Sequence, residues 1–179
     1  KKIRDLAGIV ECERLLDVLE EYCADSDQFI RIACIQCFHK AGLHNGIEIF
    51  LFDKDPKVRL EAIKRLIDSG NGLESVYKLL LTEENSDNIE LILDFIRRHG
   101  KWEGIGYLIS FYNKERLQDL KSRAISAIAT IIRRENIKID PEIFIDAIRN
   151  SDPYDYGIRI KALYGLICNK EVDHSITQL

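Results

Sequence analysis

Apolar residues recur along this chain with the period of an α-helix, most clearly between Asp53 and Gly70. Their spacing of i, i+4, i+5 and i+8 places four side chains on one helical face: Val58, Ala62, Ile63 and Leu66. Asp55 is expected to cap the first turn, and Pro56 suits the first helical position because its missing N–H is not needed there. Gly70 favours a left-handed stop. The segment therefore predicts one complete amphipathic helix.

The core of that helix is an apolar residue, then Arg, then a small residue three positions further on. In this helix the pattern is Val58-Arg59…Ala62. Similar patterns occur at Ile3-Arg4…Ala7, Ile30-Arg31…Cys34, Leu120-Lys121…Ala124 and Ile158-Arg159…Ala162. Successive basic positions lie 27, 28, 62 and 38 residues apart, and the longest interval leaves room for a copy near Ile89 that lacks the Arg. Self-similarity at this period indicates an array of helical repeats.

A second helical segment is predicted between these first helices. The segments are Glu11–Cys23, Asn45–Phe52, Leu73–Thr82, Lys101–Asn113 and Glu142–Arg149. Short joints rich in Gly, Asn and Asp separate them, as antiparallel helix pairs require. Since no segment alternates with period two, the chain is predicted to be all-α, with about eleven helices in a stack of helical hairpins.

The repeated pattern Asp-x-x-Val-Arg-x-x-Ala-x-x-x-Leu with a closing Gly resembles the HEAT and HEAT-like (bilin-lyase-type) helical repeat family. The likeness is strongest over Asp27–Gly70. It implies an α-solenoid, a superhelix of antiparallel helix pairs whose second helices line a concave face, with about five to six repeats. We expect one domain over residues 1–179, with repeats at about 1–24, 25–52, 53–83, 84–114, 115–150 and an incomplete 151–179.

The resemblance also implies a role for acidic and basic residues at the starts of the first helices. Three aspartates precede three arginines by four positions: Asp27, Asp55 and Asp155 before Arg31, Arg59 and Arg159. In HEAT-like stacks such residues tend to form ladders between neighbouring repeats. A row of half-buried pairs would set the stacking register, although a single surface pair contributes little.

Composition narrows the function classes. Of the 179 residues, 46% are hydrophobic and 31% are charged, as in a folded protein. The net charge of −4 disfavours nucleic acid as a partner, because phosphate binding normally needs a basic excess. No apolar run reaches the roughly 20 residues of a membrane span. Methionine is absent and the chain opens at Lys1, so we expect further repeats, a membrane anchor or another domain beside this piece in a longer protein.

Cysteines indicate a compartment rather than a metal site. The chain has five cysteines, an odd number, and they lie within helical patterns. This favours a reducing, cytoplasmic location over a disulfide scaffold. Cys34 and Cys37 form a CxxC with His39 and His44 nearby. Zinc needs four converging ligands, yet Cys34 occupies the core alanine position and His39 lies on another side of the helix. We therefore predict no metal and no cofactor.

Basic doublets at the ends of the first helices allow two interpretations. They are His39-Lys40, Lys64-Arg65, Arg97-Arg98 and Arg133-Arg134. A cationic edge for nucleic acid is one interpretation. The favoured one is that cations at helix C-termini complement the helix dipole, in keeping with the acidic total charge.

Aromatic side chains gather in the second helices, where a partner would bind. The candidate partner-binding residues are Tyr77, Lys78, Trp102, Tyr107 and Phe111. Packing between repeats explains an apolar stripe at helical spacing most simply. The alternative is an aromatic groove for a peptide or helix, since Tyr and Trp are favoured binding anchors.

No catalytic motif accompanies these features: the chain has no G-x-S-x-G, no Gly-rich phosphate loop and no H-E-x-x-H. We predict a non-enzymatic scaffold or adaptor that binds a protein along the concave face. The alternatives are a nucleic-acid-binding module that uses the basic doublets and an enzyme. HEAT-like proteins of the latter kind include bilin lyases and DNA glycosylases, but no motif specific to either is visible.

Overall fold

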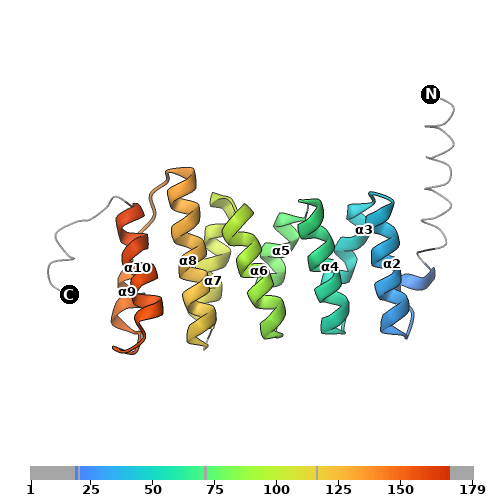
Figure 1. Ribbon diagram of the computed structural model, residues 1–179, viewed down its shortest axis with the longest axis horizontal. Helices are drawn as coiled ribbons and strands as arrows, with labels where there is room; N and C mark the ends of the chain where they lie inside the picture. The colour runs from blue at the N-terminus through green and yellow to red at the C-terminus, as the bar shows by residue number, and fades with distance from the viewer. Residues whose placement is uncertain (1–18, 20, 71, 116, 170–179) are drawn as a thin grey trace, which may run out of the picture. The chain divides into compact units, whose positions relative to one another are not determined.

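The computed structural model describes residues 19, 21–70, 72–115 and 117–169, and over this part of the chain it is all-helical (Figure 1). The chain divides into two compact units, Lys1–Gly72 and Leu73–Leu179, which are described separately below. The repeat copy around Arg4, most of the predicted helix Glu11–Cys23 and the segment Ser175–Leu179 lie outside the described residues.

The first unit contains α2 (Gln28–Lys40), α3 (His44–Glu48), the 3₁₀ helix η1 (Ile49–Phe52) and α4 (Pro56–Ser69). Helices α2 and α4 pack against each other, and α3 contacts both (Figure 1). Ile35, Leu51 and Ile63 are among its fully buried side chains. The predicted second helix Asn45–Phe52 is thus present, but its last turn is tightened into a 3₁₀ helix.

Helix α4 confirms the predicted capped helix in detail. The Asp55 carboxylate accepts a hydrogen bond of 2.8 Å from the backbone N–H of Lys57, and Pro56 is the first helical residue. Gly70 ends the helix with φ of 70°, a left-handed conformation that glycine adopts without a side-chain penalty. The four buried side chains of α4 are those of the predicted stripe: Val58, Ala62, Ile63 and Leu66.

Ala62 offers a test of this packing. It is fully buried. Ala62→Leu is therefore expected to overpack the α4 interface and to lower the free energy of unfolding by roughly 1–3 kcal/mol. Lys64→Leu, at an exposed position of the same helix, should change it by no more than about 0.5 kcal/mol. Urea unfolding followed by circular dichroism measures both; equal effects of the two variants would contradict the packing account.

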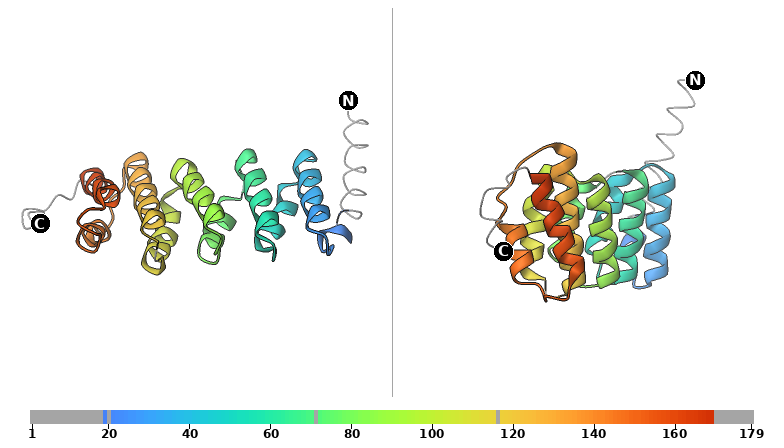
Figure 2. Two further views of the ribbon diagram at one scale, coloured as in Figure 1. Left: turned by 60° about the horizontal axis from the view of Figure 1, so that its bottom comes forward. Right: turned by 60° about the vertical axis from the view of Figure 1, so that its left-hand side comes forward.

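The second unit consists of α5 (Leu73–Leu80), α6 (Ser86–His99), η2 (Trp102–Gly104), α7 (Ile105–Lys114), α8 (Gln118–Glu135), α9 (Glu142–Arg149) and α10 (Tyr156–Asn169). Helix α8 packs between α6 and α10, and α5, α7 and α9 form a second layer on one side of that row (Figure 2). Within that second layer, α5 contacts α7. Helix α9 has the predicted bounds, whereas the predicted segment Lys101–Asn113 begins with the 3₁₀ turn η2.

Buried polar side chains close the ends of helices in this unit. Glu83 accepts hydrogen bonds from the backbone N–H groups of Glu84 and Asn85 and from the Asn88 amide, which fixes the start of α6. At the end of α10, the Asn169 amide donates to the carbonyl of Ile139 at 2.8 Å and accepts from the N–H of the same residue at 2.9 Å. These bonds satisfy backbone groups of the segment just before α6 and of the connection between α8 and α9, which no helix pairs.

The unit boundary falls within the repeat predicted over residues 53–83, since α4 belongs to the first unit and α5 to the second. A single stack over residues 1–179 therefore stays a prediction. The all-helical class is established for the described residues.

Candidate functional site

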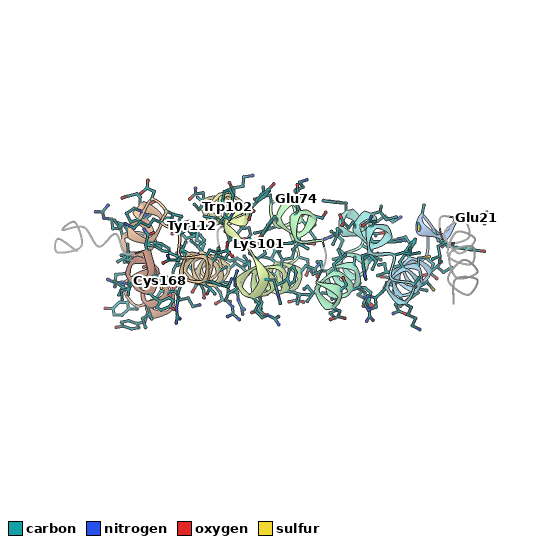
Figure 3. The ribbon with its side chains drawn as sticks, turned by 90° about the horizontal axis from the view of Figure 1, so that it is seen from above. Glu21, Glu74, Lys101, Trp102, Tyr112 and Cys168 are labelled. Atoms are coloured by element: carbon teal, nitrogen blue, oxygen red, sulfur yellow. The ribbon has the colours of Figure 1, made fainter. Side chains whose placement is uncertain are left out.

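A groove in the second unit brings together side chains from α5, η2 and α7. Its volume is about 510 Å³, and it is lined by Leu73, Glu74, Tyr77, Lys101, Glu103 and Tyr107. Figure 3 shows Glu74 and Trp102 on the layer of α5 and α7, with Lys101 between them. We call this the α5–α7 groove.

Two tyrosines form the floor of the groove. The rings of Tyr77 and Tyr107 are stacked, with centroids 5.5 Å apart and planes 17° from parallel. Tyr77 is buried, and its phenol oxygen accepts a hydrogen bond of 2.8 Å from the backbone N–H of Lys101. Tyr107 is only partly exposed, and it lines the groove together with Tyr77. Burial raises the pKa of the Tyr77 phenol.

Gly104 allows Tyr77 to reach this position. A Cβ atom on Gly104 would lie 2.3 Å from two carbons of the Tyr77 ring, closer than any real Cβ contact. The backbone at Gly104 has φ of −78°, so the requirement is for space and not for an unusual conformation. The sequence placed Gly104 within the predicted segment Lys101–Asn113 and did not indicate that this glycine supports an aromatic ring.

Charged and apolar side chains surround the tyrosine pair. Glu74 forms an exposed ion pair with Lys78 at 2.8 Å, and the hydrogen bond from this ammonium group lowers the pKa of Glu74. Glu103 and Lys101 are exposed and make no ion pair with any described residue. Trp102, between them in sequence, is 59% exposed, an unusual placement for a residue of its size.

The predicted partner-binding residues thus fall into two places. Tyr77 and Tyr107 line the α5–α7 groove, Trp102 is part of the adjoining turn η2, and Lys78 pairs with a groove residue. Phe111 is buried and lines a different cavity of about 520 Å³ with side chains that include Leu117 and Leu120. Helical spacing alone placed Phe111 beside Tyr107, but the structure gives the two residues different surroundings.

The predicted stacking residues of the first unit are organised around Asp53. The Arg31 guanidinium makes two hydrogen bonds to its carboxylate, at 2.7 and 2.8 Å, and both side chains are almost fully buried. Asp53 also accepts a hydrogen bond from the N–H of Asp55. Burial alone would raise the pKa of Asp53, but these bonds and the charge of Arg31 outweigh it and lower the pKa. Arg31 therefore links α2 to the start of α4.

Asp27 and Asp55 act as helix caps, and a role of either residue between repeats stays a prediction. Each caps its own helix, Asp27 through the N–H of Phe29 and Asp55 through that of Lys57. Asp53, two residues before the cap, was not predicted as the partner of Arg31. The signal in the sequence was that a second aspartate, Asp53, lies two residues before Asp55.

The remaining stacking candidates also contact the starts of their own helices. Arg59 donates to the Asp53 carbonyl at 2.8 Å, and Arg159 donates to the Pro153 carbonyl at 3.0 Å. Asp155 accepts from the N–H of Gly157 at 3.1 Å. A role of these three residues between repeats stays a prediction.

In two of the four basic doublets, Arg97-Arg98 and Arg133-Arg134, both side chains take part in polar contacts within the fold. Arg97 and Arg98 both bind Asp94, and Arg134 donates to the carbonyls of Arg97, Arg98 and Gly100 at the end of α6. Arg133 donates to the phenol oxygen of Tyr164 at 2.6 Å. Their donors are thus partly used in holding helix ends.

The cysteines and histidines of α2 and α3 do not form a group that could bind a metal ion among the described residues. Over the described residues, no group of three or more His, Cys, Asp or Glu side chains is placed to hold a metal ion. Cys34 is buried and Cys37 is exposed, and burial raises the pKa of the Cys34 thiol. The rings of His39 and His44 lie 6.2 Å apart. Cys12 lies outside the described residues.

Comparison with known proteins supports the helical fold and adds no function. No protein-family model matches the sequence, and no curated protein matches it either. Among solved structures, the crystal structure of an engineered protein from the Northeast Structural Genomics Consortium is similar, with a TM-score of 0.53 and 15% identity over 92% of this chain and 82% of that chain. At this identity the likeness concerns the fold alone. No described helix is long and apolar enough to cross a membrane.

Proposed function

We propose that this chain is a non-enzymatic scaffold of HEAT-like helical repeats that binds a segment of another protein in the α5–α7 groove. The observation that carries the proposal is the stacked pair of Tyr77 and Tyr107 at the floor of an open groove. Tyr77 is held by a backbone hydrogen bond and by Gly104. A binding surface that is ordered before the partner arrives loses less entropy on association.

The composition of the groove matches that of a protein interface. Protein interfaces are enriched in Tyr and Trp, which combine a large apolar surface with a polar atom. Here the half-exposed Tyr107 and the exposed Trp102 supply apolar surface, and Lys101 and Glu103 supply charged groups at the edge. A buried aromatic anchor with a polar rim is the arrangement in which binding energy concentrates.

The repeat architecture is part of the proposal. The row of α6, α8 and α10 with a second layer of α5, α7 and α9 is what stacked antiparallel helix pairs would produce. A cytoplasmic setting is proposed with it, because Cys34, Cys37 and Cys168 form no disulfide and Cys34 is buried.

Tyr107→Ala tests the binding site. A display library of random twelve-residue peptides is selected on the wild-type chain, and the enriched peptides are then measured by fluorescence polarisation. Loss of the Tyr107 side chain should weaken binding of the enriched peptides by at least about tenfold, as truncation of an anchor residue does.

Tyr154→Ala is the matched control, since Tyr154 is 82% exposed and lies outside the groove. It should leave peptide affinity unchanged. If no peptide is enriched, or if the enriched peptides bind Tyr107→Ala as tightly as wild type, the proposed function is wrong.

A further inference from the structure

The charges at the α5–α7 groove point to one class of ligand side chain. Two carboxylates, those of Glu74 and Glu103, and one ammonium group, that of Lys101, belong to its lining. Glu74 already meets Lys78, whereas Glu103 has no cationic partner among the described residues. A carboxylate in a lining that also holds two tyrosines thus forms no ion pair with any described residue.

The aromatic floor strengthens this preference. The face of a tyrosine ring carries negative electrostatic potential and attracts an ammonium or guanidinium group, and arginine is used more often than lysine. Tyr107 is partly exposed and lines the same groove as Glu103, so its ring offers such a surface. Arginine can stack its planar head on an aromatic ring and donate hydrogen bonds to a carboxylate at the same time.

Building on the proposed function, we infer that the partner segment places an arginine or lysine side chain in the α5–α7 groove, stacked on Tyr107 and paired with Glu103. The long alkyl stem of that side chain covers the apolar lining near Leu73 while its charged end reaches the carboxylate. The net charge of −4 on the chain favours approach of a basic segment.

Two neighbouring substitutions should act in opposite directions. Glu103→Gln removes the attracting charge and is expected to weaken binding of a basic peptide by roughly three- to tenfold. Lys101→Gln removes a repelling charge from the same lining and should tighten binding by about two- to threefold. Both side chains are exposed, and the backbone N–H of Lys101 that holds Tyr77 is unchanged. Neither variant is therefore expected to unfold the unit.

The experiment uses the peptides that the selection on the wild-type chain enriches and that require Tyr107. They are expected to share one arginine or lysine, and replacing it by citrulline or norleucine, which lack the charge, should weaken binding at least about tenfold. Asp68→Asn, a change of the same charge at an exposed site on α4, is the control and should have no effect.

The possible outcomes separate the two proposals. Peptides that require Tyr107 but share no basic residue, or that lose no affinity with Glu103→Gln, overturn the inference and leave the proposed function standing. Acidic peptides that bind more tightly to Glu103→Gln and more weakly to Lys101→Gln overturn it in the same way. If no peptide requires Tyr107, the proposed function fails and the inference fails with it.

Discussion

Asp53→Ala is expected to destabilise the first unit by about 3–5 kcal/mol, the cost of leaving a buried charge without its partner. The Arg31 side chain is only 4% exposed, and its guanidinium donates hydrogen bonds to both carboxylate oxygens of Asp53. Once these are removed, the remaining hydrogen bonds of Arg31 go to the carbonyls of Asp25 and Ser26. Urea unfolding followed by far-ultraviolet circular dichroism measures the loss.

Asp68→Ala is the control for this variant, because Asp68 also lies in the first unit but pairs with Arg65 at 3.7 Å on the surface. An exposed pair of this kind contributes at most about 1 kcal/mol. If both variants lose the same small amount of stability, the pair of Arg31 and Asp53 does not hold α2 to the start of α4.

The effect of Asp53→Ala should also depend on pH in a defined direction. The pKa of Asp53 is lowered in the folded chain from an ordinary value of 3.8, so its carboxylate stabilises the fold fully above that value. The contribution disappears as pH falls through the lowered pKa. Wild type and variant should therefore differ most near neutral pH and converge in strong acid.

Gly104→Ala is expected to disrupt the α5–α7 groove by displacing the Tyr77 ring. The added methyl group would overlap the Tyr77 ring, which is buried and stacked on Tyr107 and cannot move without breaking its bond to Lys101. The cost in stability should be about 1–3 kcal/mol. Because the tyrosine pair would be displaced, binding of peptides that require Tyr107 should fall at least about tenfold.

Gly106→Ala provides a matched control two residues away. A Cβ atom there meets nothing within 4 Å, and the residue lies inside α7. Alanine at an exposed helical position is favoured over glycine by up to about 1 kcal/mol, so this variant should be as stable as wild type or more so, with unchanged binding. Equal behaviour of the two variants would show that Gly104 does not support the groove.

The helices were predictable because their signals are local. In α4 the cap, the proline, the stop and the buried stripe depend on residues within one helix, and each was read correctly between Asp55 and Gly70. Helix α9 likewise has its predicted bounds. Apolar period and capping chemistry act over a few residues, so a sequence displays them directly.

Contacts between elements were less predictable. The partner of Arg31 is 22 residues away in the chain. From the sequence alone, Asp25, Asp27 and Asp55 were equally good candidates for that partner. Likewise, helical spacing could group Tyr107 with Phe111 but could not show that the first faces a groove and the second a separate cavity. Gly104 supports Tyr77 only because η2 packs against α5 in the fold. A local sequence pattern does not show such a contact.

The most direct test of the central claim is to map peptide binding on the wild-type chain by changes in amide ¹H–¹⁵N chemical shifts, with a selected peptide that requires Tyr107 as the probe. We predict that the largest changes occur in α5, in η2 and in the first turns of α7, together with the indole N–H of Trp102. Changes centred instead on α6, α8 and α10, or in the first unit, would contradict it.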